Sequence, residues 1–399
     1  MKTLVKGNEA VVIGALVAGC DAYFGYPITP ASEIAEKAAK YFLKLKKIFV
    51  QAECEVGSIN MVYGAASSGL RVMTASSGPG ISLKQEGVSY LAGANLPAVI
   101  IDVMRVGPGL GNIGPEQADY NQVVKGGGHG NYHAIVLAPN SVAEMYSLTI
   151  KAFELADKYR TPVYLLADAT IGQMMEPIDV QPVKVDRPEK PWKADGTPET
   201  NRNLITSIYL DFNDMEAHIM RLAEKYKKIT AAEPMAESFM TDDAEIVVTG
   251  FGIVSRLLHT VVESLRKKGL KVGLIRPKTL WPFPTKFYQK HVAPDAKVLA
   301  VELSLGQFVD DVRLALPGNE VSHYGRSGGN IPTLEELEKQ VKKLAKGLAK
   351  PVVKATVKPA GKVAGKAAGK APAKAVKAAK PAAKAAKLAA KKPAGSKAK

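Results

Sequence analysis

Fifteen consecutive residues without a charge, Val56–Leu70, constrain the fold of this chain more than any other stretch. Small residues (Gly, Ala and Ser) recur through the run, so another backbone can approach it closely. A helix that is uncharged on every side has to be packed on every side. The apolar segment before it, Lys47–Val50, indicates a buried strand. The sequence therefore predicts a buried strand, a short polar link and a fully buried helix.

Two carboxylates, Glu53 and Glu55, lie at the start of this helix, and Glu55 is the nearer to the uncharged run. One interpretation is that Glu55 only complements the positive end of the helix dipole, which is worth under about 1 kcal/mol at an exposed site. The other is that burial lets Glu55 hold or share a proton near neutral pH, as a general acid or base does. Taken alone, the segment favours the first interpretation.

Composition limits the class of protein. A chain of 399 residues is long enough for two or three domains. No run approaches the roughly 18 apolar residues of a membrane span, and the first residues lack a signal-peptide layout. We therefore expect a soluble cytoplasmic protein without membrane contact. Cys20 and Cys54 are too few for a disulfide framework or an iron–sulfur cluster.

The positive charge is concentrated in the last 49 residues. The net charge is +16, but Pro351–Lys399 holds 14 lysines and no acid, which leaves +2 for residues 1–350. This tail consists mostly of Ala, Lys, Pro and Gly. It cannot offset its ordering entropy by burying apolar surface, so we expect it to be disordered.

Apolar segments alternate with amphipathic ones, which predicts an α/β fold with two doubly wound regions. In the first region, strands are expected at Ala22–Tyr26, Lys47–Val50, Arg71–Ala75, Leu96–Met104, His133–Leu137 and Pro162–Leu166, and helices at Asn8–Gly19, Ser32–Tyr41, Ile81–Leu91 and Ser141–Tyr159. In the second, strands are expected at Glu245–Thr249, Lys271–Ile275 and Lys297–Val301, and helices at Val254–Lys268, Gly306–Leu316 and Leu334–Leu344. A polar, proline-rich connector with one or two helices separates the regions.

Unusual loops follow four of the expected strands, where ligands bind in parallel sheets. They are Tyr26–Pro30, Gln51–Glu55, Ser76–Gly80 and Arg105–Gly114. The glycines of the last loop have the wrong spacing for a dinucleotide fingerprint, and there is no Walker phosphate loop, which argues against a stand-alone nucleotide-binding dehydrogenase.

Two other segments have conventional interpretations. His129 and His133 are four residues apart, but they lie in a glycine-rich stretch without a nearby cysteine, so no metal site is predicted. Arg276–Pro284 contains three prolines in nine residues, which indicates a rigid surface loop.

Taken together, five segments resemble the 2-oxoacid:ferredoxin oxidoreductases. They are Gly25–Pro30, Glu55–Ser58, Ser76–Ser82, Met104–Pro108 and Arg276–Pro282. The resemblance covers residues 1–345 in order. It implies a pyrimidine-side thiamine diphosphate domain at 1–175, a connector at 176–242, a transketolase C-terminal-like domain at 243–346 and a tail at 347–399. Val103–Gly130 is most similar to 2-oxoisovalerate enzymes, with the 2-oxoglutarate branch close.

The resemblance also implies roles for residues in the loops. Glu55 matches the glutamate that hydrogen-bonds the aminopyrimidine of thiamine diphosphate and so promotes removal of the thiazolium proton. Thr29 matches a residue beside the reacting carbon, and Arg105 one that binds the substrate carboxylate. The same loops place Ser77, Gly78 and Pro79 among the expected cofactor contacts. Capping of the next turn (Thr29) and a purely structural arginine (Arg105) remain the alternatives.

The family's missing parts imply partner chains. There is no Gly-Asp-Gly motif followed by asparagine to hold Mg²⁺ and the diphosphate, and there are no cysteine clusters. A diphosphate-domain thiamine subunit and a ferredoxin-like iron–sulfur subunit would supply these groups, with coenzyme A as co-substrate and ferredoxin as electron acceptor. The implied reaction is oxidative decarboxylation of a 2-oxo acid, 2-oxoisovalerate first and 2-oxoglutarate next, to acyl-CoA and CO2.

An alternative function is nonspecific nucleic-acid binding through the polycationic tail. If about six lysines contact duplex phosphates, log K is expected to fall with log salt at a slope near −5, from roughly −0.9 per contact. Deleting Pro351–Lys399 should abolish this binding, because the remaining charge is +2, and should leave oxo-acid oxidation intact. Gel shifts at rising salt and a turnover assay on the truncated complex test both statements. DNA binding that survives the deletion would refute the assignment to the tail.

Overall fold

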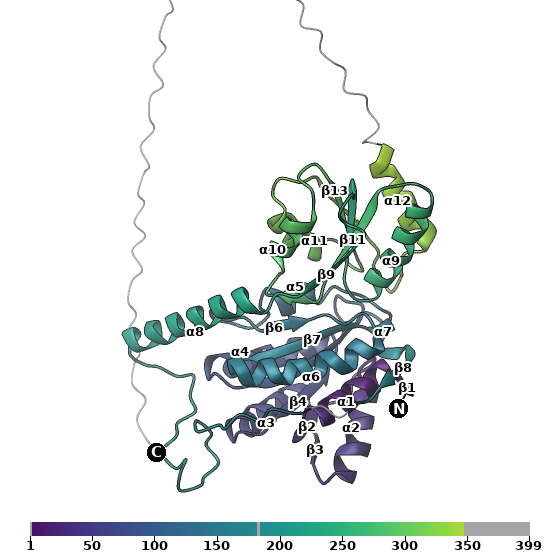
Figure 1. Ribbon diagram of the computed structural model, residues 1–399. Helices are drawn as coiled ribbons and strands as arrows, with labels where there is room; N and C mark the ends of the chain where they lie inside the picture. Colours follow the sequence, from purple (N-terminus) through teal and green to yellow (C-terminus); the bar gives the residue numbers. More distant parts are fainter. Residues whose placement is uncertain (1, 182–183, 347–399) are drawn as a thin grey trace, which may run out of the picture. The chain divides into compact units, whose positions relative to one another are not determined.

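The computed structural model describes residues 2–181 and 184–346, all within one compact unit that spans Met1–Lys350. Two sheets of mainly parallel strands, each with helices on both faces, form this unit (Figure 1). The predicted α/β class with doubly wound sheets is confirmed. The predicted disorder of the tail lies outside the described residues, and the domain boundaries stay a prediction.

The N-terminal region is built on a seven-stranded sheet in the order β12-β6-β7-β5-β4-β2-β3, in which only β12 is antiparallel to its neighbour. Its strands are β2 (Ala22–Gly25), β3 (Ile48–Gln51), β4 (Val72–Ser76), β5 (Ala98–Met104), β6 (Ile135–Leu137), β7 (Pro162–Asp168) and β12 (Thr279–Trp281). β1 (Lys2–Lys6) and β8 (Met175–Asp179) pair separately as an antiparallel ribbon.

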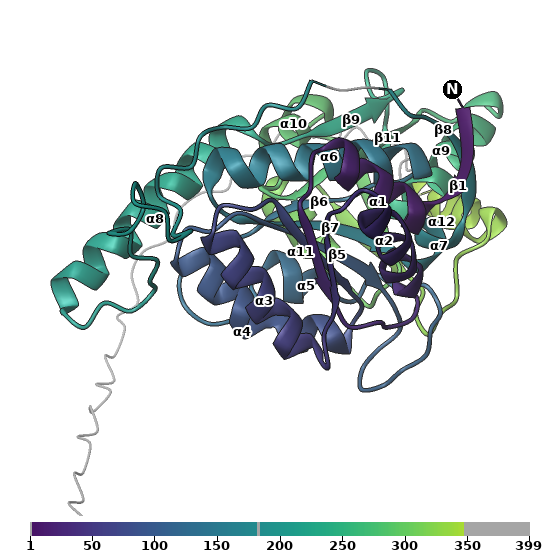
Figure 2. The same cartoon turned by 90° about the horizontal axis from the view of Figure 1, so that it is seen from below.

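Helices cover both faces of this sheet (Figure 2). α1 (Gly7–Val17), α2 (Ser32–Lys44) and α6 (Val142–Tyr159) share one apolar core with the sheet, and α3 (Glu55–Ser67) and α4 (Pro79–Gly93) share the other. The short helices α5 (Tyr120–Val124) and α7 (Ala169–Gln173) follow β5 and β7. Pro79 fits the first helical position of α4, where a missing N–H does no harm, and Gly78 before it has φ +42°.

The C-terminal region is built on a five-stranded sheet in the order β14-β13-β10-β11-β9. Its strands are β9 (Ala236–Phe239), β10 (Ile246–Thr249), β11 (Val272–Pro277), β13 (Lys297–Glu302) and β14 (Val321–Gly325), and its helices are α9 (Gly252–Lys267), α10 (Thr285–His291), α11 (Phe308–Ala315) and α12 (Leu334–Lys346). The connector contains the 21-residue helix α8 (Phe212–Ala232), which extends beyond the sheets in Figures 1 and 2.

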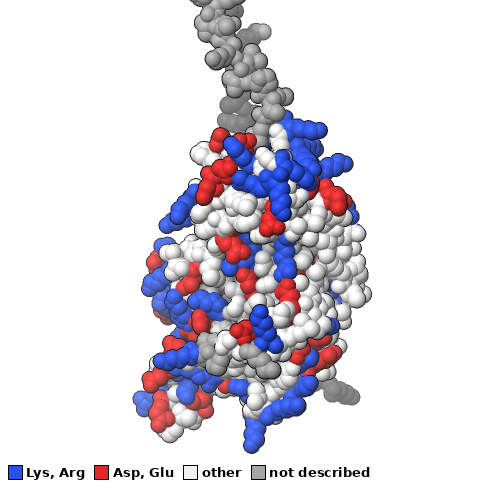
Figure 3. Space-filling view, turned by 45° about the vertical axis from the view of Figure 1, so that its right-hand side comes forward, with Lys and Arg blue, Asp and Glu red and all other residues white. Residues whose placement is uncertain are grey.

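The surface agrees with the near-neutral charge of residues 1–350. Acidic and basic side chains are interspersed over the face drawn in Figure 3. Among the helices that the structure describes, none has the length and apolar character needed to cross a bilayer.

Two predictions are wrong, one about the strand before Glu55 (β3) and one about the helix that begins there (α3). β3 is not buried: it is the outermost strand of its sheet, and Ile48 is 44% exposed. α3 is not packed on every side, because Val56, Asn60 and Gly64 form an exposed stripe opposite the face that packs on α4 and the sheet. The uncharged sequence of α3 therefore exceeds what packing within this chain requires.

Two smaller corrections concern strand and helix ends. Serine favours N-cap positions, so the sequence indicates Ser32 as the N-cap of its helix; in the structure Ser32 is the first residue of α2 and the N-cap is Ala31. Pro162–Leu166 is not the last strand of its sheet, since β12 joins the sheet from more than 100 residues further along the chain.

The segment that was predicted as a surface loop, Arg276–Pro284, is a buried connection between the two sheets. Its first two residues, Arg276 and Pro277, are the end of β11 in the C-terminal sheet. The next strand, β12, belongs to the N-terminal sheet, where Thr279 and Trp281 pair with β6. Leu280 is fully buried between them. The three prolines lie outside β12: Pro277 is the last residue of β11, and Pro282 and Pro284 follow β12.

A buried ion-pair cluster stabilises this connection. The Arg276 side chain is 2% exposed, and its two Nη atoms donate to the Glu144 carboxylate at 2.6 and 2.7 Å. Its Nε lies 2.7 Å from Glu237, and Lys278 pairs with both acids. Burial opposes ionisation of Glu144, but the hydrogen bonds from Arg276 outweigh it and hold the pKa of Glu144 at about 2.

Replacing Arg276 by methionine should lower the free energy of unfolding by up to about 3–5 kcal/mol, because the partly buried Glu144 loses its two-pronged partner and keeps the ion pair with Lys278. The double variant Arg276→Met with Glu144→Met should recover part of the loss, since no buried charge remains unpaired. Denaturant unfolding of the three proteins measures both effects. A single variant as stable as the wild type would show that the cluster contributes little.

Candidate active site

The predicted site residues lie on loops at the carboxyl ends of β2, β3, β4 and β5. The Ser76–Gly80 loop joins β4 to α4 and has Glu55 on one side and Arg105 on the other, as close approaches at Gly80 and Gly78 show. Thr29 joins the group through a hydrogen bond with Arg105. The structure therefore brings Thr29, Glu55 and Arg105 around one loop.

Glu55 is the first residue of α3 and is 6% exposed. Its Oε1 atom lies 2.7 Å from the point where a Cβ on Gly80 would be, and Ser76 Oγ lies closer still. Any side chain at Gly80 would collide with both groups. The glycine therefore allows the carboxylate to lie directly against the loop.

Ser76 and Ser77 have buried hydroxyls without a hydrogen-bond partner among the described residues. Buried hydroxyls are rarely left unpaired, so an unpaired pair beside a buried carboxylate indicates a place for a polar ligand. A ring with polar edge atoms, such as an aminopyrimidine, fits this donor and acceptor set. The residues present therefore fit the pyrimidine end of thiamine diphosphate.

Lys84, on α4, is a buried neighbour of Glu55 that sequence analysis missed. Its side chain is fully buried; Nζ donates to Ser58 Oγ and lies 3.4 Å from the main-chain oxygen of Glu55. Burial lowers the pKa of Lys84 to about 8, and attraction to Glu55 and Cys54 partly opposes this. The sequence signal that could have revealed Lys84 is that it is the only charged residue in the first seven residues of α4.

Arg105 is held by main-chain oxygens. Nη1 donates to the Thr29 oxygen at 2.8 Å and Nη2 to the Leu110 oxygen at 3.3 Å, while Nε has no partner among the described residues. Thr29 is exposed and lines an open cavity of about 710 Å³ together with Pro30, Glu33, Ile113 and Pro115. Arg105 is therefore preorganised, with its position set by the backbone of the Thr29 loop.

Two further carboxyls, Asp102 and Asp119, lie beneath the Ser76–Gly80 loop and were also missed. Asp102 is fully buried in β5. Within the described part of the chain, neither of its oxygens nor the buried Oδ2 atom of Asp119 has a hydrogen-bond partner. Burial raises the pKa of Asp102 well above its usual range, and the nearby Asp119 raises it further. One acid inside the apolar strand Ala98–Met104 could have revealed Asp102.

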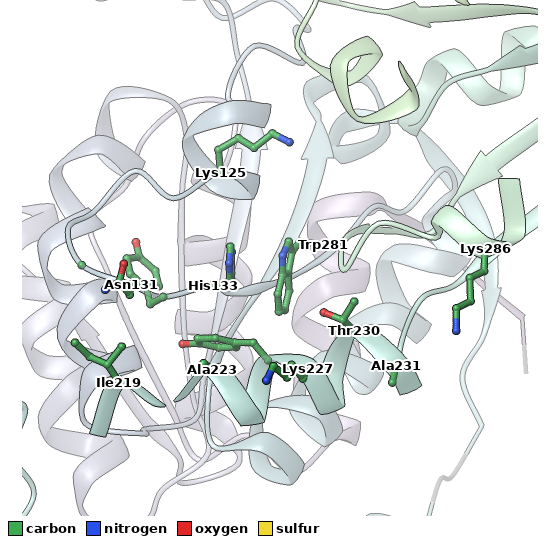
Figure 4. A pocket seen from close by; sticks show the side chains of 13 residues that line it. Lys125, Asn131, His133, Ile219, Ala223, Lys227, Thr230, Ala231, Trp281 and Lys286 are labelled. Atoms are coloured by element: carbon green, nitrogen blue, oxygen red, sulfur yellow. The ribbon is translucent and has the colours of Figure 1, made fainter. Parts of the chain in front are cut away.

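A second cavity, of about 780 Å³, is lined by none of these residues. Figure 4 shows its lining. It is bordered by His133, by Tyr226 of α8 and by Trp281 of β12. The His133 and Trp281 rings stack with centroids 4.7 Å apart. His129 contacts Ser89 instead, and no group of three potential metal ligands occurs in the described part of the chain.

Comparisons with known proteins show which families and relatives this chain is similar to. Residues 13–240 match the family described as pyruvate flavodoxin/ferredoxin oxidoreductase, thiamine diphosphate-binding, and residues 244–337 match the pyruvate:ferredoxin oxidoreductase core domain II. The ketoisovalerate oxidoreductase subunit VorB of Methanothermobacter marburgensis is 56% identical over 340 residues, which are 85% of this chain and 97% of that subunit. The 2-oxoglutarate synthase subunit KorA of Methanothermobacter thermautotrophicus is 36% identical over 84% of this chain and 96% of its own length.

Solved structures show the same fold. The 2-oxoglutarate:ferredoxin oxidoreductase from Magnetococcus marinus, with 2-oxoglutarate, coenzyme A and succinyl-CoA bound, is similar with a TM-score of 0.80 and 27% identity. The match covers 86% of this chain and 65% of that one. A split-gene transketolase, 12% identical with a TM-score of 0.54, shares only the fold.

The buried ammonium of Lys84 should make stability depend on pH. Its pKa is lower in the folded chain than the ordinary 10.5, so the folded state binds fewer protons between about pH 8 and about pH 10.5. The free energy of unfolding is therefore expected to rise across this window, by no more than about 3 kcal/mol. The wild type should gain more stability across this window than Lys84→Met does, since the buried Lys225 and Cys20 also have shifted pKa values but are present in both proteins. Lys339→Met, at an exposed position, should match the wild type. Equal pH profiles for the wild type and Lys84→Met would contradict the assignment.

Proposed function

The chain belongs to the 2-oxoacid:ferredoxin oxidoreductase family, and we propose that it forms the pyrimidine-side half of an active site that oxidatively decarboxylates 2-oxoisovalerate. The observation that carries this proposal is the convergence of buried Glu55, Thr29 and Arg105 around the Ser76–Gly80 loop. The 56% identity to a ketoisovalerate oxidoreductase subunit supports the branched-chain substrate. 2-Oxoglutarate is the second candidate, in line with the more distant KorA relatives.

Each site residue has a distinct role in this proposal. The Glu55 carboxyl holds the proton that it exchanges with the aminopyrimidine ring, and Ser77, Gly78 and Pro79 line the same ring. When bound, thiamine diphosphate supplies the carbon nucleophile and the electron sink of the reaction. The Arg105 guanidinium binds the substrate carboxylate through charge-assisted hydrogen bonds, and Thr29 lies beside the reacting carbon. The products are CO2, an acyl-CoA formed from coenzyme A, and electrons for ferredoxin.

The remaining groups come from partner subunits. We propose that a diphosphate-domain thiamine subunit brings the Mg²⁺ and diphosphate ligands, and that a ferredoxin-like subunit carries iron–sulfur clusters to external ferredoxin. Two features of this chain support such partners: the exposed stripe of α3 next to Glu55, and four large apolar side chains before and at the start of α8. These are Leu204, Ile208, Leu210 and Phe212, each at least 72% exposed. Large apolar side chains that are this exposed within nine residues support an interface here.

The nucleic-acid alternative gains nothing from the comparisons, since the relatives reported above are oxidoreductase subunits. The tail remains outside the described residues. Nonspecific contact of its lysines with nucleic acid is therefore an added property to test and not the proposed function.

Glu55→Gln in the assembled complex should lower turnover about 100-fold or more, because an amide cannot exchange the ring proton. The fold should survive, since the amide has the shape of the acid. Glu53→Gln, the same change at an exposed position two residues away, should keep wild-type turnover. Viologen reduction with 2-oxoisovalerate measures all three proteins. Turnover of Glu55→Gln close to that of the wild type would remove Glu55 from the mechanism.

A further inference from the structure

Besides the carboxylate of the proposed substrate, Arg105 has a carboxylate of this chain nearby, that of Asp119. If Gly78 carried a Cβ, that atom would lie 3.9 Å from Asp119 Oδ2 and 4.0 Å from Arg105 Nε. Both of these atoms are buried and lack a hydrogen-bond partner among the described residues. An unpaired acid oxygen and an unpaired guanidinium nitrogen therefore face the same small space beside Gly78.

The rest of the Arg105 guanidinium is already committed. Nη1 and Nη2 donate to the main-chain oxygens of Thr29 and Leu110, which are neutral acceptors. The hydrogen bonds that hold Arg105 among the described residues therefore leave its positive charge without a bonded carboxylate. The carboxylates of the substrate and of Asp119 can therefore compete for Arg105, because either one would gain a charge-assisted hydrogen bond in a partly desolvated environment.

We propose that Asp119 is a positioning residue that sets how strongly Arg105 binds the substrate carboxylate. The neutral acid leaves the guanidinium charge free for the substrate. The ionised acid attracts the guanidinium through Nε and competes with the substrate. This inference rests on the substrate-binding role proposed above for Arg105.

The surroundings of Asp119 allow both forms to occur in the working pH range. Burial raises the pKa of Asp119 to about 6; the Gly78 amide and Arg105 oppose this, and Glu116 adds to it. Asp102, from β5, also faces Asp119, and burial together with Asp119 raises the pKa of Asp102 well above its usual range. The competition from Asp119 for Arg105 therefore increases as pH rises through about 6.

The test measures the affinity of the assembled complex for the carboxylate across pH. KM for 2-oxoisovalerate and the Kd of isovalerate, an unreactive carboxylate, are determined from about pH 5 to about pH 8. In the wild type both should rise several-fold with pH, without a parallel change in kcat. In Asp119→Asn both should stay at the low-pH value. Glu86→Gln, which removes an exposed carboxylate from α4, should keep the wild-type profile.

The outcomes separate this inference from the proposed function. Arg105→Lys should weaken binding of both ligands at every pH, since an ammonium cannot replace the planar guanidinium. Unchanged affinity in Arg105→Lys would overturn the role of Arg105 and the inference with it. Weakened affinity in Arg105→Lys, together with an Asp119→Asn profile that still follows the wild type, would overturn the inference alone. A wild-type Kd of isovalerate that does not change between about pH 5 and about pH 8 would also overturn the inference alone.

Discussion

The shared strand segment Arg276–Trp281 is the constraint on which the two halves of this structure depend. β11 belongs to the C-terminal sheet, and β12 completes the N-terminal sheet only two residues later. The buried Arg276–Glu144 ion pair fixes the turn between them. Because one short segment takes part in both hydrogen-bonded ladders, the two regions cannot separate without unpairing an edge strand and exposing a buried charge.

Much of the fold and the centre of the site could be predicted from sequence, for a simple physical reason. Buried parallel strands are continuous apolar runs, and the loops that follow them have to lie at one edge of the sheet. Unusual loops at four such ends therefore predicted a common site, and the structure brings Thr29, Glu55 and Arg105 together there. The roles of these residues stay predictions, since geometry alone does not show chemistry.

The errors share a different cause, which is dependence on partners that are distant in sequence. Local composition could not show that Thr279 pairs with Leu137, so a rigid strand between sheets was interpreted as a surface loop. α3 was expected to be buried on every side, yet nothing among residues 2–181 and 184–346 covers Val56 or Asn60. Lys84 was missed because its partner Ser58 is 26 residues away in the sequence. Asp119 was missed because its neighbour Gly78 lies on another loop.

The C-terminal region contains none of the predicted site residues, but it fixes the loop that carries two of the groups discussed above. Gln117, two residues before Asp119, is fully buried and makes three hydrogen bonds to main-chain atoms of Leu303 and Phe251, at 2.8, 2.9 and 3.0 Å. Glu116 accepts a further bond from Ser327 at 2.6 Å. The segment from Arg105 to Asp119 is thus held by the Thr29 loop at its start and by the C-terminal region at its end. A region without any of the predicted site residues therefore helps to position the site, because it holds Gln117, two residues before Asp119.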